Sequence, residues 1–81
     1  MRLLPLSALC PNQTALVQCV EGGHGVRGRL ASLGFTPGAE VHMIQNYGRG
    51  PLIVEVRGAR VALGRREAMR VLVEPTAPLK R

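Results

Sequence analysis

Residues 26–41 read Val26-Arg-Gly-Arg-Leu-Ala-Ser-Leu-Gly-Phe-Thr-Pro-Gly-Ala-Glu-Val41, and this run predicts a short helix, a turn and the start of a strand. Val26, Leu30 and Leu33 are spaced i, i+4 and i+7, so they share one face of a helix. Arg29 lies at the edge of that face, and we expect it to brace the helix by bonding backbone carbonyls. The helix is therefore predicted to bury a single stripe of side chains.

The end of this helix is marked by glycine and proline. Gly34 suits the left-handed conformation that ends a helix, and Phe35 is then placed to pack back on Leu30. Pro37 forbids continuation of the helix, and Gly38 supplies the positive φ of a type II turn. The residues that we expect to be structural are Leu30, Leu33, Gly34, Phe35, Pro37, Gly38 and Gly58.

The composition indicates one small, basic domain. Eighty-one residues leave room for a single core, which must be aliphatic because the chain has one Phe, one Tyr and no Trp. Ten Arg against one Lys dominate a formal charge of +6. Arginine makes planar, bidentate contacts, so this surface favours carboxylate or phosphate partners, although a merely solvated basic surface is the alternative.

The same composition places the chain in the cytoplasm. No segment reaches the ~20 apolar residues of a membrane span. Cys10 and Cys19 belong to no C-x-x-C pair of metal or redox type. Cys19 lies in an apolar strand, so we expect a buried, reduced thiol.

A hairpin is predicted in the second half of the chain. Residues 52–57 alternate, with Leu52, Val54 and Val56 facing inward. Gly58 and Ala59 are expected to form a two-residue type II′ turn, after which residues 59, 61 and 63 continue the inward face.

Further elements complete an all-β fold. The segments outside the hairpin are predicted to be a helical turn at 5–9 that buries Leu6 and Leu9, strands at 14–20, 39–46 and 70–74, and a 3₁₀ turn at 64–68. About five antiparallel strands, with one short α-helix between the first two, predict a small SH3-like barrel. Residues 1–74 would form this single domain, and residues 75–81 a disordered C-terminal tail.

The run described first resembles a known signature. Arg29-Leu30, Leu33-Gly34, Pro37-Gly38 and Val41 match the R-L-x-x-L-G-x-x-P-G-x-x-V pattern of the FeoA family, small cytoplasmic proteins that accompany the ferrous-iron permease FeoB in bacteria. The resemblance extends from about Leu6 to Val73. It implies an SH3-like fold and a non-catalytic, regulatory protein of ferrous iron uptake that acts by binding FeoB.

The residues themselves predict no enzyme. Nucleophilic catalysis needs a base beside the nucleophile and a group that orients the base, whereas this chain has two His, two scattered Cys and no Asp. We therefore expect no catalytic residue and no cofactor.

Metal ligands are sparse. Glu21 and His24 lie in one predicted loop, and His42 lies on a strand. Two ligands cannot form a selective closed site, so we expect at most adventitious binding of a divalent metal at these three residues. Two solvent-exposed histidines are the simpler interpretation.

Arginines are the strongest remaining feature. The residues predicted to bind a partner are Arg27, Arg49, Arg57, Arg65 and Arg66. The partner would be the cytoplasmic face of the permease, and a homo-oligomer is left open. A nucleic-acid-binding barrel is the alternative suggested by the charge, but the chain lacks the aromatic platforms on which bases stack, so no nucleic acid is expected. A metal-sensing, SH3-like effector domain is a third hypothesis.

Overall fold

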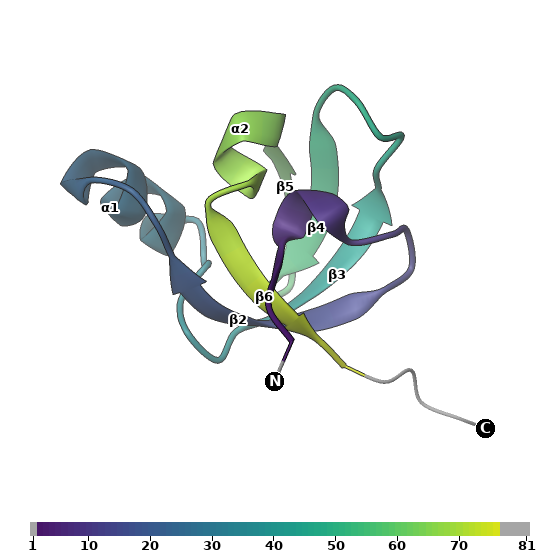
Figure 1. Ribbon diagram of the computed structural model, residues 1–81, viewed down its shortest axis with the longest axis horizontal. Coiled ribbons are helices and arrows are strands. Elements are labelled where there is room, and N and C mark those ends of the chain that lie inside the picture. The colour runs from purple at the N-terminus through teal and green to yellow at the C-terminus, as the bar shows by residue number, and fades with distance from the viewer. Residues whose placement is uncertain (1, 77–81) are drawn as a thin grey trace.

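The computed structural model describes residues 2–76, and they form one bent antiparallel sheet with a helix beside it (Figure 1). The elements in chain order are β1 (Leu4–Pro5), the 3₁₀ turn η1 (Leu6–Ala8), β2 (Thr14–Val20), α1 (His24–Ser32), β3 (Glu40–Gln45), β4 (Leu52–Val56), β5 (Ala59–Leu63), α2 (Arg65–Ala68) and β6 (Val71–Pro75). The strand order is β1-β6-β2-β3-β4-β5. The all-β class is confirmed, with a sixth strand, β1, added to the five predicted.

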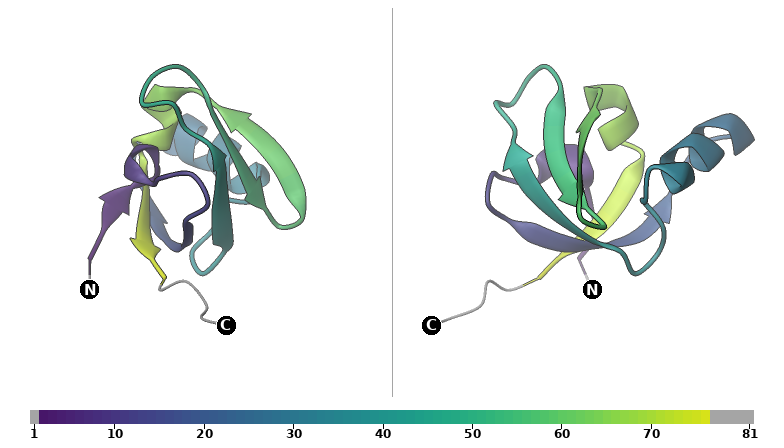
Figure 2. Two further views of the ribbon diagram at one scale, coloured as in Figure 1. Left: turned by 90° about the vertical axis from the view of Figure 1, so that its right-hand side faces the viewer. Right: turned by 180° about the vertical axis from the view of Figure 1, so that it is seen from behind.

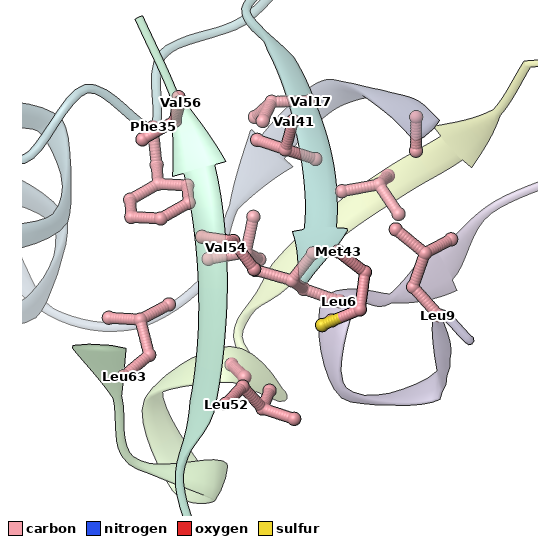
Figure 3. Packing of buried hydrophobic residues seen from close by; sticks show 14 of the residues in the cluster. Leu6, Leu9, Val17, Phe35, Val41, Met43, Leu52, Val54, Val56 and Leu63 are labelled. Atoms are coloured by element: carbon pink, nitrogen blue, oxygen red, sulfur yellow. The ribbon is translucent and has the colours of Figure 1, made fainter. Parts of the chain in front are cut away.

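The core is aliphatic, as the composition predicts. Every residue classed as buried within 2–76 is apolar, and the largest is Phe35, which is 1% exposed. Figure 3 shows the side chains of Phe35, Val54 and Leu63 among the packed residues of this cluster. Leu6 and Leu9 from the N-terminal turn are fully buried, as predicted.

α1 lies outside the curled sheet, next to the end of β2 (Figures 1 and 2). Leu30 is its one fully buried residue, and Val26 and Leu33 pack against the core while partly exposed. The predicted stripe is therefore confirmed. Two glycines, Gly25 and Gly28, lie inside this nine-residue helix, where each disfavours helix by about 1 kcal/mol relative to alanine. Packing of the stripe, rather than local propensity, holds α1 in place.

The helix ends as the sequence predicts. Gly34 has φ +110°. Its N–H donates to the Ala31 carbonyl at 3.0 Å, and the Phe35 N–H donates to the Leu30 carbonyl at 3.0 Å. These two bonds form a Schellman motif, which directs Phe35 back into the core.

The Pro-Gly turn is also confirmed, and it is hydrogen-bonded to β2. Gly38 has φ +88°, and the Ala39 N–H donates to the Thr36 carbonyl at 2.9 Å, as in a type II turn. The Gly38 N–H donates to the Val17 carbonyl at 2.7 Å, and the Val17 N–H donates to the Ala39 carbonyl at 2.8 Å. The turn therefore fixes the start of β3 beside β2.

The predicted hairpin turn was wrong by one residue. Val56 lies opposite Ala59, so the two loop residues are Arg57 and Gly58. Both have positive φ, +52° and +80°, which is the type I′ geometry that matches the twist of a hairpin. Leu52, Val54 and Val56 are buried as predicted, but Ala59 beside the turn is exposed.

The expectation of a buried Cys19 thiol was also wrong. The register of β2 against β6 shifts between Val17 and Cys19, so Gln18 is an extra residue at a β-bulge. The bulge interrupts the alternation that buries Ala15 and Val17, and Cys19 is exposed as a free cysteine. A second register shift, between Met43 and Gln45, accounts for the break in alternation at Ile44.

The last elements differ in detail from the prediction. α2 is one turn of α-helix rather than a 3₁₀ turn, because the Ala68 N–H donates to the Gly64 carbonyl four residues earlier. β6 continues to Pro75, and the Thr76 N–H donates to the Thr14 carbonyl at 3.0 Å. The ordered sheet thus passes the predicted boundary at residue 74. The rest of the predicted tail, 77–81, lies outside the described residues.

Candidate partner-binding surface

The arginines of residues 2–76 differ in what they contact. They are Arg2, Arg27, Arg29, Arg49, Arg57, Arg60, Arg65, Arg66 and Arg70. Some are bound within the molecule, and these are less available to a partner than those that point into solvent. Separating the two groups identifies the arginines that are candidates for binding a partner.

Arg65 is bound within the molecule. Its Nη2 donates to Asn46 Oδ1 at 2.8 Å, and its Nη1 donates to the Ser7 carbonyl at 3.4 Å. The Asn46 amide nitrogen in turn donates to the carbonyls of Ser7 and Leu9, at 3.0 and 2.8 Å. Arg65 therefore joins α2 to η1 and to the end of β3, a structural role that the sequence prediction did not give it.

Arg57 also has partners within the chain. From the hairpin turn, its Nη2 donates to Thr36 Oγ1 at 2.6 Å, and its Nε donates to the Gly34 carbonyl at 3.4 Å. The side chain thus connects the β4–β5 turn to the segment after α1. Arg57 is nevertheless exposed, so a partner could reach its guanidinium group.

Arg29 forms an ion pair with Glu67 of α2. This corrects the expectation that Arg29 bonds backbone carbonyls. The two side chains are 59% and 28% exposed, so solvent screens the pair and its contribution is at most about 1 kcal/mol. The pair links the only two α-helices of residues 2–76.

Arg27, Arg49 and Arg66 are the free members of the predicted set. All three are exposed, and no side-chain hydrogen bond or ion pair within residues 2–76 involves them. Arg66 lines an open groove with Glu21, Met69 and Arg70, and Met69 is 56% exposed. An exposed methionine in a groove that is also lined by two arginines is suited to contact with a protein partner.

The three predicted metal ligands are not brought together. His42 lies opposite Thr14 at the start of β2, and its Nδ1 is 3.2 Å from Thr14 Oγ1. Glu21 and His24 follow the other end of β2, about 20 Å away at the rise of a strand. Among residues 2–76, no group of three or more His, Cys, Asp or Glu side chains is arranged to hold a metal ion. Metal binding here stays a prediction.

A row of polar side chains crosses the sheet. Thr14 lies opposite His42, His42 opposite Glu55, and Glu55 opposite Arg60, so that β2, β3, β4 and β5 each contribute one residue. Cross-strand partners share a face of the sheet. Glu55 and Arg60 are exposed, which makes this the outer face.

Aromatic side chains offer little to nucleic acid. Phe35 is buried, while Tyr47 is 76% exposed, and the sequence has no other aromatic residue of the Phe, Tyr or Trp type. Single-strand binders stack successive bases on several such rings. The Tyr47 ring is therefore a single exposed platform for a base, which is too little for the nucleic-acid alternative.

Sequence reasoning missed Asn46 and Glu67. Asn46 accepts from Arg65 and from the Gly48 N–H while donating to two carbonyls, and no local pattern marks such a long-range contact. Glu67 could have been found from the sequence, because a Glu three residues after the residue that precedes a helix is typical of a contact at the helix N-terminus. In the structure, Glu67 Oε1 accepts from the Gly64 N–H at 3.4 Å.

No helix within residues 2–76 has the length and apolar character needed to cross a membrane.

Comparisons of sequence and structure identify proteins that are similar to this chain. The family model described as the FeoA domain matches residues 4–75. A candidate Fe(2+) transport protein A of Methanocaldococcus jannaschii is 32% identical over 72 residues, which are 89% of this chain and 87% of that protein.

Solved structures agree with the family match. A crystal structure of an iron uptake regulatory protein, FeoA, superposes with a TM-score of 0.88 at 37% identity, over 93% of this chain and 100% of that one. A zinc complex of FeoA from Stenotrophomonas maltophilia, described as a procaryotic SH3 domain protein, gives 0.77 at 39% identity, over 85% of this chain and 87% of that one. The SH3-like fold predicted from the sequence is confirmed.

Proposed function

The chain belongs to the FeoA family of ferrous iron transport, and from this premise we propose that it is a non-catalytic, cytoplasmic accessory protein that binds the FeoB permease. The family match covers almost the whole chain, so the proposal concerns the domain itself. The S. maltophilia relative is described as a candidate ferrous iron transport activating factor, which supports an accessory role.

The single observation that carries the proposal is the set of free guanidinium groups. Arg27, Arg49 and Arg66 point into solvent without a bond in residues 2–76. Guanidinium groups are suited to bidentate contacts with carboxylates. Exposed basic groups of this kind speed encounter with an acidic protein surface and select against basic ones.

A non-catalytic role agrees with the interior. All buried residues within 2–76 are apolar, so the interior serves packing alone. Most ionisable side chains are exposed, and Arg65, which is partly buried, is held by hydrogen bonds to Asn46 and Ser7. This arrangement supports recognition rather than chemistry.

Binding to the purified cytosolic domain of the organism's own FeoB tests the proposal. We expect saturable binding at physiological salt, and about tenfold weaker binding after Arg27, Arg49 and Arg66 are all replaced by Ala. Random-sequence DNA is the competing ligand, and we expect only weak binding that raised salt abolishes. Tight binding to DNA, with none to the permease domain, would overturn the proposal.

A further inference from the structure

β5 is the longer open edge of the sheet. The strand order places β1 at one edge and β5 at the other. β1 has two residues and ends at Pro5, which has no N–H, so it offers little to a further strand. β5 has five residues and pairs only with β4 within residues 2–76. In Figure 2 (left), β5 borders the sheet on one side.

Two residues of β5 turn their backbone groups away from β4. Val56 and Ala59 close a two-residue turn, so they form a hydrogen-bonded pair. Bonding pairs alternate along an antiparallel ladder, which points the N–H and C=O groups of Arg60 and Ala62 outward. Both residues are exposed, and no backbone bond outside the β4–β5 ladder involves them in the described chain. Within the described residues, the N–H and C=O groups of Arg60 and Ala62 are therefore four unpaired backbone groups, spaced as an added strand would need them.

The charges beside this edge favour an acidic strand. The cross-strand row His42, Glu55, Arg60 places a carboxylate next to Arg60 on one side and leaves its other side open. A strand added to β5 would place one residue directly opposite Arg60, where a carboxylate contributes favourably and a like charge does not. Val61, on the inner face, is only partly buried, so an apolar neighbour would cover it.

A second copy of the chain fits this edge poorly. If two β5 strands paired antiparallel about Val61, their Arg60 side chains would be diagonal neighbours on one face, about 7–8 Å apart. Pairing Arg60 directly with its counterpart would bring the charges closer still. A basic residue at the centre of an edge strand is a common protection against self-pairing.

We propose that β5 accepts an extended acidic segment of a partner protein as an additional strand, with a carboxylate opposite Arg60 and an apolar residue beside Val61. The inference rests on the proposed function, because the segment would belong to the cytosolic part of the permease. Main-chain bonds to Arg60 and Ala62 would supply affinity, and the alternating side chains would supply specificity.

Two variants test the two halves of this interaction. Ala62→Pro removes an outward N–H without removing a bond to β4, and Ala62→Thr keeps the N–H while enlarging the side chain. Arg60→Glu reverses the charge at the edge, and Arg2→Glu makes the same charge change on an exposed residue next to β1, at the far edge. Circular dichroism melts check that each variant folds.

Titration against the permease cytosolic domain should show binding weakened about tenfold by Ala62→Pro and by Arg60→Glu. Arg2→Glu and Ala62→Thr should weaken it much less. Amide hydrogen exchange gives a second readout: the N–H groups of Arg60 and Ala62 should exchange fast in the free protein and become protected in the complex.

Each outcome has one meaning. If the wild-type protein binds but both variants bind equally well and the two amides stay unprotected, strand addition is overturned and the proposed function stands. If the wild-type protein does not bind the permease domain, the proposed function fails, and this inference with it. If the two amides are protected in the protein alone as its concentration rises, β5 pairs with a second copy and the acidic-partner proposal is overturned.

Discussion

Arg65 donates a 2.8 Å hydrogen bond from Nη2 to Asn46 Oδ1, and this contact joins α2 to the end of β3. The Asn46 amide nitrogen itself donates to the carbonyls of Ser7 in η1 and of Leu9 directly after it. One arginine of the predicted partner-binding pair is therefore part of the scaffold, whereas its neighbour Arg66 is exposed. Adjacent residues of the same type thus differ in their contacts, and the effect of this difference on stability can be measured.

Replacement of Arg65 by Ala should destabilise the protein by about 1–3 kcal/mol, because it leaves Asn46 Oδ1 and the Ser7 carbonyl without a charged donor. Arg66→Ala should change stability by less than about 0.5 kcal/mol. Urea unfolding of the two variants gives the comparison. Equal stabilities would show that the Arg65 contacts contribute nothing.

Two glycine substitutions should have opposite signs. Gly34→Ala places a Cβ at φ +110° and should destabilise the fold by about 1 kcal/mol or more. Gly28→Ala lies inside α1 with open space around the added methyl group and should stabilise by about 0.5–1 kcal/mol. Thermal melts of both variants decide the matter. A stabilising Gly34→Ala would contradict the Schellman ending of α1.

Both thiols should react in the native state. Cys10 and Cys19 are free and exposed, so a thiol reagent such as dithionitrobenzoate should titrate two groups before any denaturant is added. Cys19→Ser should leave one reactive group. If the Cys19 thiol reacted only after unfolding, it would be buried in the native state, which would contradict the outward orientation that the bulge at Gln18 gives it.

The Arg29–Glu67 pair should contribute little. Both partners are partly in solvent, so a double-mutant cycle with Ala at each position should give a coupling free energy of about 0.2–1 kcal/mol that falls as salt is added. Glu67→Ala should cost more than Arg29→Ala, since the carboxylate also accepts from Gly64. The reverse order would indicate that the Gly64 contact is not formed in solution.

The parts of the fold that were predicted from sequence rest on local constraints. Gly34 and Gly38 have positive φ at positions where few other residues are comfortable, so glycine and proline placed the helix end and the turn within one residue. The alternation of Leu52, Val54 and Val56 likewise gave the inner face of β4. These signals act over a few residues.

The errors arose where distant segments decide the outcome. Cys19 is turned outward by the register of β2 against β6, which no neighbouring residue reveals. The hairpin turn was misplaced for a local reason instead, because Arg57 adopts positive φ, a conformation that is uncommon for a residue with a long side chain. Arg65 is predicted to bind a partner because the sequence gives no sign of its bonds to Ser7 and Asn46, which lie 58 and 19 residues away.

α1 is anchored by one fully buried leucine and contains two glycines. Its local unfolding would expose Leu30 and the partly buried Val26 and Leu33 but leave the strands paired, so the free energy of opening should be below that of the whole domain. We therefore expect the helix to open and re-form while the strands remain paired. A binding partner that changes the conformation of α1 would therefore face a smaller free-energy cost than one that opens the sheet.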